Sequence, residues 1–257
     1  MDVIASLTGR PRALARIVRE MTLTPDDDPV HSRVLVTLSA DGLATPARDD
    51  TTPSVTARYE PPFFEAFDAP EEPVYAVLGT RPTLDWLGWF PDGEVTVHFR
   101  GEESIAHAAE IRGAGYRAEV GPLPTDVAVR GLDGDAATDV DALVPDDGTE
   151  TTRVETDAAA LERLADAAAI VRDDGVPVIV EDGAFRLSVE GELMRSDGRL
   201  PGDVTGPDCE NLYGDGLAAV ARTLTGPVTL QIVPNGPMTV TQETEHATRR
   251  YLLRQTM

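Results

Sequence analysis

The sequence contains no lysine and only one cysteine. All 22 basic residues among its 257 are arginines, and they face 45 acidic residues, which gives a formal net charge of -23. The lone Cys209 cannot form a disulfide within the chain, which is typical of a reducing compartment. No apolar run is long enough to span a bilayer, and the first ten residues lack the pattern of a signal peptide. We therefore expect a soluble, cytoplasmic protein.

The acidic residues are spread over the whole chain in short clusters. Aspartates are adjacent at positions 26–28, 49–50, 146–147 and 173–174, whereas a disordered acidic tail would form one block. The hydrophobic fraction of 41% is ordinary for a globular protein. Such an acidic surface resembles that of haloarchaeal proteins, which work in molar salt. The net charge therefore indicates habitat and solubility more than it indicates binding partners. It does not exclude a nucleic acid as ligand, because the arginines could gather on one face.

Hydrophobic periodicity predicts four helices, at about residues 9–21, 81–90, 157–171 and 215–224. In the first of them Pro11 suits the opening turn, and an apolar stripe follows at helical spacing, formed by Leu14, Ile17, Val18 and Met21. Asp157 is a good N-cap for the third. Seven β-branched or alternating runs predict strands, at residues 34–38, 74–78, 95–99, 176–180, 185–189, 228–233 and 238–242.

The two halves of the chain repeat the same order of elements. Each half has a helix, a strand, an Asp-Gly turn signal (Asp41-Gly42 and Asp182-Gly183), further strands, a shorter helix and a closing strand. The polar stretch between them has no convincing periodicity. We expect an N-terminal domain at residues 1–132, a linker at 133–152 and a C-terminal domain at 153–257.

Four segments, in their order and spacing, carry a resemblance to a known family. They are Asp41–Leu43 with Ala47–Asp49, then Phe63–Phe67, then Asn211–Tyr213 with Gly216–Val220, and the closing runs Val228–Leu230, Pro237–Val240 and Arg250–Leu253. Together they resemble the archaeal and eukaryotic sliding clamps of the proliferating-cell-nuclear-antigen type. None of the four is a catalytic motif.

The resemblance implies an α+β DNA-clamp fold in which two similar domains of antiparallel sheet carry their helices on the inside. Copies would associate edge to edge into a ring, a homotrimer or a mixed ring, with double-stranded DNA in its hole. Such a ring has no chemistry of its own. It tethers a DNA polymerase, a clamp loader or repair enzymes through their docking peptides. Closing a ring also removes exposed sheet edges.

Arginines on the predicted helices are the candidate DNA contacts. Arg12, Arg16 and Arg19 fall at i, i+4 and i+7, opposite the apolar stripe, and Arg10 lies just before them. The other inner helices offer Arg81, Arg163 and Arg222. These side chains would contact phosphates without reading bases, although a merely solvated helix face is the alternative. At 1 M salt the Debye length is only about 3 Å, so the attraction between arginines and phosphates is strongly screened. A closed ring would stay on DNA because it is topologically linked to it.

The resemblance also implies a pocket for partner peptides between the linker and the C-terminal strand. By position it would be formed by Thr52, Pro53, Val140, Leu143, Pro237, Tyr251 and Leu253. The chain departs from the family here, because Leu253-Arg254 replaces the usual Ala-Pro after Tyr-Leu. Residues 100–130, where the first domain should provide strands for the subunit contact, also match poorly. The alternative is a divergent paralogue that regulates a standard clamp, or joins it in mixed rings, without encircling DNA alone.

Patterns for catalysis, metals and cofactors are not convincing, and a small-molecule enzyme is the weakest hypothesis. Gly113-Ala114-Gly115 lacks the third glycine and the context of a phosphate loop. The aspartates at 133, 135, 139 and 141 lack the glycine and glutamate of a calcium loop. The four histidines have no zinc spacing. Trp86 and Trp89 are interpreted as core or interface residues, not as a base-stacking platform. We expect no metal and no cofactor.

Overall fold

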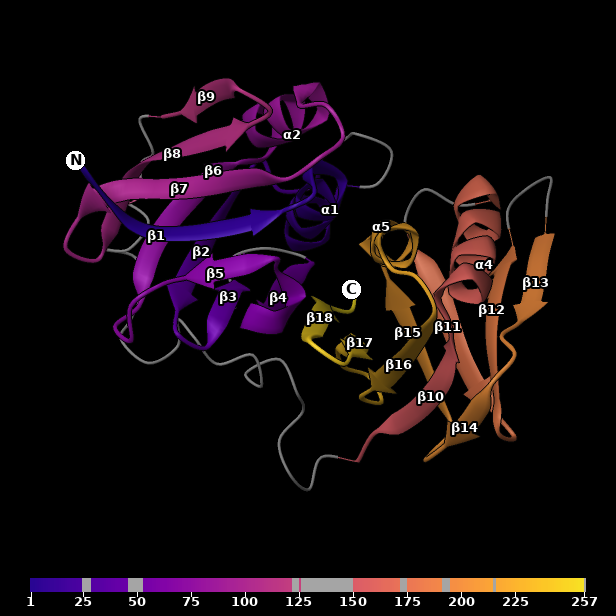
Figure 1. The fold of residues 1–257 in the computed structure, drawn as a ribbon. Helices are drawn as coiled ribbons and strands as arrows, with labels where there is room; N and C mark the ends of the chain where they lie inside the picture. Colours follow the sequence, from indigo (N-terminus) through magenta and orange to yellow (C-terminus); the bar gives the residue numbers. More distant parts are fainter. Residues whose placement is uncertain are drawn as a thin grey trace. The chain divides into compact units, whose positions relative to one another are not determined.

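The structure is a computed structural model, shown in Figure 1, and it describes residues 1–24, 29–45, 53–121, 125, 150–171, 175–190, 195–214 and 216–256. The chain divides into two compact units. Unit 1 comprises Met1–Ala47, Val55–Ala142 and Thr244–Thr248, and unit 2 comprises Arg48–Ser54, Leu143–Glu243 and Arg249–Met257. No helix in the described part of the chain is long and apolar enough to cross a bilayer.

Unit 1 is built on one sheet with two helices. Its strands lie in the order β4-β3-β2-β6-β8-β7-β1-β5, with β9 added to β8, and all pairs are antiparallel except β6 with β8. The elements are β1 (Asp2–Gly9), α1 (Pro11–Thr22), β2 (Arg33–Ser39), β3 (Gly42–Thr45), β4 (Ser54–Tyr59), the 3-10 helix η2 (Pro61–Phe63), β5 (Ala66–Asp68), β6 (Val74–Gly79), α2 (Thr80–Trp89), β7 (Val95–Glu102), β8 (Ile105–Gly113) and β9 (Tyr116–Val120).

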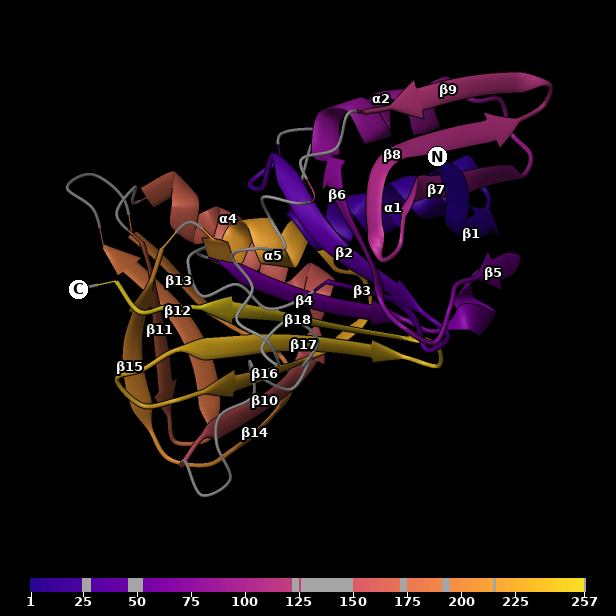
Figure 2. The same cartoon turned by 90° about the vertical axis from the view of Figure 1, so that its left-hand side faces the viewer.

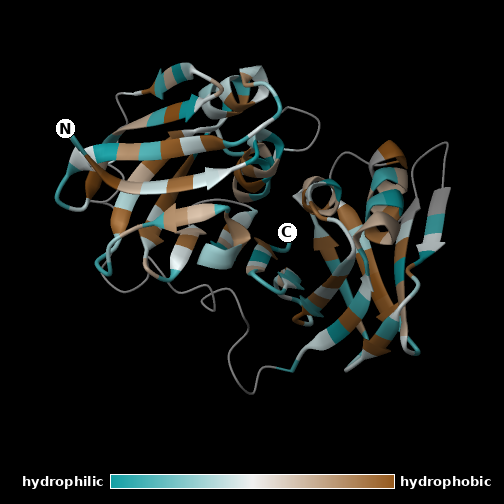
Figure 3. Cartoon of the chain, in the orientation of Figure 1, coloured by the Kyte–Doolittle hydropathy of each residue, from teal (hydrophilic) through white to brown (hydrophobic). Residues whose placement is uncertain are grey.

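The core of unit 1 lies between the sheet and the paired helices α1 and α2. The predicted apolar stripe of α1 is confirmed, because Leu14, Ile17, Val18 and Met21 are at most 5% exposed. Figure 3 shows the alternation of apolar and polar residues along the strands that leaves one side of each strand for this core. The apolar side of α1 is thus fixed on the sheet, and its opposite side faces away from the core.

Unit 2 has two sheets and a second pair of helices. One sheet has the order β14-β10-β16-β17-β18 and the other β13-β12-β11-β15 (Figure 2). Helices α4 and α5 pack against each other, and α4 also contacts β10 to β13. The elements are β10 (Thr152–Asp157), α4 (Ala158–Val171), β11 (Val176–Glu181), β12 (Ala184–Glu190), β13 (Arg195–Arg199), β14 (Asp203–Thr205), β15 (Cys209–Tyr213), α5 (Gly216–Thr223), β16 (Pro227–Ile232), β17 (Met238–Thr244) and β18 (Ala247–Leu253).

The predicted α+β class, the four helices and the seven strands are confirmed, with shifts of one to three residues at their ends. Asp157 caps α4 through a 2.9 Å hydrogen bond from the Ala159 amide to its Oδ1. The Asp182-Gly183 turn is also confirmed, with φ of +51° and +68° as a two-residue hairpin loop requires. Strand β10 begins at Thr152, inside the range expected to be linker, while residues 133–149 lie outside the described part.

Candidate nucleic-acid interface

The exposed side of α1 is cationic. Arg12, Arg16 and Arg19 are exposed on the side opposite the buried stripe, and Arg10 is the exposed residue just before the helix. The helix carries one acidic residue, Glu20. The structure therefore brings together, on one surface, the four arginines that the sequence places there.

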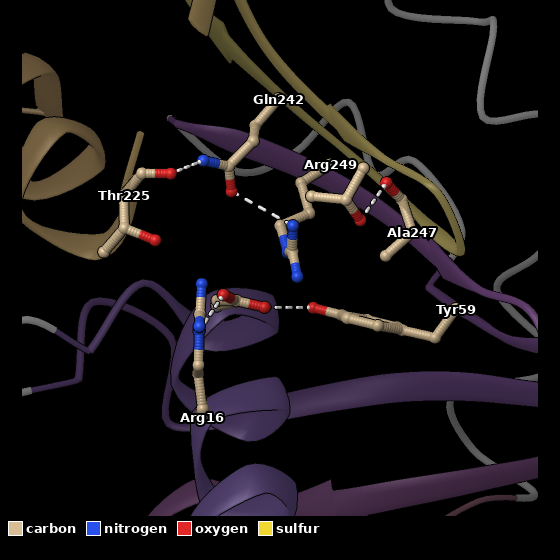
Figure 4. Close-up of polar contacts among 8 residues, drawn as sticks. Arg16, Tyr59, Thr225, Gln242, Ala247 and Arg249 are labelled. Carbon is tan, nitrogen blue, oxygen red and sulfur yellow. Dashed lines mark hydrogen bonds and ion pairs between the residues drawn. The ribbon is translucent and has the colours of Figure 1, made fainter. Parts of the chain in front are cut away.

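The side chain of Glu20 is buried and does not face solvent. Its side chain is 1% exposed, and it accepts a 2.8 Å bond from Arg16 Nε and a 2.7 Å hydrogen bond from the Tyr59 hydroxyl (Figure 4). A buried carboxylate needs partners of this kind to offset the loss of water. Consequently the carboxylate itself is absent from the exposed surface of α1, and among the arginines of that surface it offsets the charge of its partner Arg16.

The remaining candidate arginine of unit 1 is Arg81, in the first turn of α2, which is exposed and shares the helix with Asp85. Arg12 approaches Asp92 at 3.6 Å, but the two side chains are 89% and 85% exposed. An ion pair this open to water contributes little, so Arg12 keeps its charge available to a ligand.

The helices of unit 2 present a different surface. Arg222 of α5 donates from Nε (3.0 Å) and Nη2 (2.6 Å) to Oδ1 of Asp166 on α4. Arg163 is exposed on α4, next to Glu162 in the sequence. Ile170, near the end of α4, is 70% exposed. This surface is therefore neutral in charge and partly aliphatic.

Of the residues assigned to the peptide pocket, Thr52, Val140 and Leu143 lie outside the described residues. Pro53 and Leu253 converge in unit 2, since a Cβ placed on Gly216 would lie 2.5 Å from Pro53 Cγ and 3.3 Å from Leu253 Cδ2. Tyr251 is 0% exposed and Leu253 2%. The structure thus makes Tyr251 a core residue of unit 2 and leaves its ring no free surface.

The neighbouring turn between β16 and β17, which contains Pro237, is fixed by Asn211. The Asn211 amide donates to the carbonyls of Val233 (2.8 Å) and Gly236 (3.1 Å), and its Oδ1 accepts from the Asn235 amide (2.9 Å). The hydroxyl of Tyr213 donates to the same Gly236 carbonyl, and burial raises the pKa of this phenol. The sequence assigns Asn211 and Tyr213 only to a segment that resembles the clamp family, because their contact with a turn some 25 residues away leaves no local signal.

Exposed aromatic side chains gather where α2 meets the last strand of unit 1. Trp86, Trp89 and Tyr116 are 37%, 54% and 53% exposed, and the ring of Trp89 lies edge-on to both others, with centroids 5.7 and 5.1 Å apart. We call these three residues the aromatic cluster. Neither tryptophan is a core residue of this unit. Tyr116 is the first residue of β9, which pairs only with β8 among the described strands.

The segment from residue 100 to 120 is well formed despite its poor match to the family pattern. On β8, Glu110 is 0% exposed and is surrounded by Arg100 (3.3 Å), Arg112 and Arg117 (2.6 Å). Burial by itself raises the pKa of Glu110, but the bond from Arg112 and the three guanidinium charges outweigh it and hold the pKa below its usual range. Glu110 and its three arginines join β7, β8 and β9, and no sequence motif predicts this arrangement.

The glycine-rich segment, the lone cysteine and the potential metal ligands can each be described from the structure. Gly113–Gly115 forms the β8–β9 turn, with φ of +48° at Ala114 and +81° at Gly115. Cys209 is half-buried, 3.9 Å from the Thr152 hydroxyl, and burial raises the pKa of its thiol. Within the described ranges, no three His, Cys, Asp or Glu residues lie close enough to hold a metal ion.

Solved structures resemble this chain along its entire length. The protein in the structure of a FEN-1 C-terminal region bound to PCNA from A. fulgidus matches with a TM-score of 0.76 at 14% identity, covering 99% of both chains. The proliferating cellular nuclear antigen of Entamoeba histolytica matches at 0.76 and 12%, covering 100% of both. The chain has the sliding-clamp fold.

A PCNA2–PCNA3 complex from Sulfolobus tokodaii also matches, with a TM-score of 0.71 at 12% identity over 97% of this chain and 98% of that one. No family model and no curated protein matches the sequence. At such low identity the likeness establishes the clamp fold and not the activity. The clamp fold nevertheless accounts for the repeated order of helices and strands in the two units.

Proposed function

We propose that this chain is a subunit of a sliding clamp, which encircles duplex DNA and tethers replication or repair enzymes to it. The observation that carries the proposal is the clamp fold over the whole chain, combined with the arginine side of α1. In a protein with a net charge of -23, four arginines on one exposed surface, with the only acid of the helix turned inward, favour a polyanionic ligand.

Ring closure would use the free edges of the two units. Strand β13 in unit 2 pairs only with β12 among the described strands, as β9 pairs only with β8 in unit 1. Edge pairing of one copy with the next would cover both edges, and the aromatic cluster beside β9 would be buried with it. We infer a homotrimer, by analogy with the clamp rings.

Partner enzymes would dock through peptides near β18. The A. fulgidus protein was solved with a FEN-1 C-terminal region, which supports the same mode here. Since Tyr251 and Leu253 are buried, Pro237 and Leu252 are the partly exposed residues that would contact such a peptide in the described part of the chain. The acidic surface suits a cytoplasm of high salt, in which linkage to DNA matters more than charge attraction.

The mass in solution tests this proposal. Light scattering after size exclusion in 1 M KCl should give about three times the 27.5 kDa of one chain. A monomer that forms no ring alone, but joins a standard clamp when the two are mixed, would instead support the paralogue alternative. A monomer that does neither would contradict the proposal.

A further inference from the structure

The two pairs of helices differ in the charge that they expose, although both carry arginines. In unit 1, α1 with the preceding Arg10 holds four arginines and one acid, and that acid is buried. In unit 2, α4 and α5 together hold Arg163 and Arg222 against Glu162 and Asp166. The formal charges of unit 2's helices therefore cancel, whereas those of α1 do not.

The geometry of the Arg222–Asp166 pair makes this cancellation effective. Two nitrogens of one guanidinium lie 3.0 and 2.6 Å from a single carboxylate oxygen, and the side chains are only 36% and 38% exposed. A phosphate would have to displace Asp166 or approach it as a second anion, and both cost free energy. By contrast, Arg12 and Asp92 lie 3.6 Å apart at over 80% exposure, where water already screens the pair.

Apart from Arg163, the described exposed side chains of α4 offer a phosphate no donor. Ala159 is exposed and Ile170 is 70% exposed on this helix. Alanine and isoleucine side chains cannot hydrogen-bond to phosphate oxygens, which account for most protein contacts to a DNA backbone.

Building on the proposed function, we propose that duplex DNA is held by unit 1 alone, through phosphate contacts of Arg10, Arg12 and Arg19 on the α1 surface. The helices of unit 2 form a neutral wall, and Arg222 is a structural residue that joins α5 to α4. Each ring would then contact DNA once per subunit, on one of its two helix pairs. Sequence position alone assigned Arg163 and Arg222 the same role as the arginines of α1.

Two matched double variants test this assignment, Arg10→Ala with Arg12→Ala and Arg163→Ala with Arg222→Ala. Each removes two exposed or half-exposed guanidinium groups. Binding to a linear duplex is measured between 0.2 and 1 M KCl, and folding is checked by circular dichroism. Each lost phosphate contact lowers the slope of log K against log salt by about 0.9. We expect the slope to fall by about 2 or more in the α1 variant and to stay unchanged in the unit 2 variant.

A third variant, Asp166→Asn, tests the pair from the other side. If Asp166 neutralises Arg222, removing its charge should release the arginine and steepen the salt dependence of DNA binding. Equal losses in the two double variants, or no gain in Asp166→Asn, would overturn the neutral wall while leaving the clamp proposal intact. A wild-type protein that does not bind the duplex even at 0.2 M KCl would overturn the phosphate contacts of α1, whereas the clamp proposal is overturned by the mass in solution described above.

Discussion

The hydroxyl of Tyr59 on β4 donates a 2.7 Å hydrogen bond to Glu20, the one carboxylate of α1. This hydrogen bond and the ion pair with Arg16 hold the carboxylate in a buried position. The burial of this carboxylate is therefore supported both by a neighbour on the same helix and by a tyrosine nearly forty residues away in the sequence. This relationship links the stability of the unit to the charge of the surface proposed to contact DNA.

Replacing Glu20 by glutamine should destabilise the protein and strengthen DNA binding. Glu20 is the buried partner of Arg16 and Tyr59, and the substitution removes its charge. We expect this loss to lower the free energy of unfolding by about 1–3 kcal/mol. Arg16, no longer paired with a carboxylate, adds its full charge to the α1 surface. Denaturant titration and DNA binding on the same samples measure both effects.

The matched control is Tyr59→Phe, which removes one hydrogen bond to Glu20 and no charge. It should lower stability by about 1 kcal/mol and leave the salt dependence of DNA binding unchanged. If Glu20→Gln weakened DNA binding while the protein stayed folded, the arrangement described for α1 would be wrong.

Replacing Trp89 by glutamate should dissociate the ring. Trp89 is 54% exposed and central to the aromatic cluster, so the substitution costs the isolated unit little, but it would bury an unpaired charge in the proposed contact between copies. Light scattering should then report the mass of one chain. Glu119→Gln, an exposed change on the neighbouring strand β9, serves as the control and should keep the wild-type mass.

Acid should destabilise unit 1 through His98 and then through Glu110. The pKa of His98 is lowered, first by burial and then by the charge of Arg112, and the pKa of Glu110 is lowered as well. A group whose pKa is lower in the folded state contributes stability above its unfolded pKa and loses it as the pH falls. For His98 this loss begins below about 6.5, and for Glu110 below about 4.3.

Comparing the melting temperatures of the wild type and His98→Asn at two pH values separates the effect of His98 from the general neutralisation of acidic groups. We expect the melting temperature of the wild type to fall more between pH 7.5 and pH 5.5 than that of the variant. Identical pH profiles would mean that His98 is not held neutral by its surroundings.

Raising KCl from 0.1 to 2 M should raise the melting temperature. With a net charge of -23, the folded chain repels itself, and the Debye length falls from about 10 Å at 0.1 M to about 3 Å or less above 1 M. A melting temperature independent of salt would contradict the interpretation of the acidic surface as an adaptation to a salty cytoplasm.

Much of the fold was predictable from local patterns, and most of the site geometry was not. Helix α1 follows from the spacing of Leu14 to Met21, and the turn at Asp182 from its dipeptide. Strands such as β1, β8 and β9 were missed, and for β8 the reason is that Ala108, Ala109 and the buried Glu110 interrupt its alternation. Alternation fails wherever both sides of a strand are covered, here by the core and by three arginines.

The arginines of α1 could be found from their spacing alone, since helical period places them on one side. The pairing of Arg222 could not be found in this way, because Arg222 contacts Asp166 on another helix, 56 residues away in the sequence. The burial of Tyr251 also depends on packing between distant strands. Contacts between residues so far apart in the chain produce no periodic pattern in a single sequence.

The most direct test of the central claim asks whether retention on DNA is topological. A linear duplex is anchored to a bead at one end, the protein is allowed to thread on, and the free end is then blocked with a bulky protein. After a wash in 1 M KCl, the duplex is cut once with a restriction enzyme. The proposed ring predicts retention before the cut and release after it. Loss during the wash, or equal retention before and after the cut, would contradict encirclement.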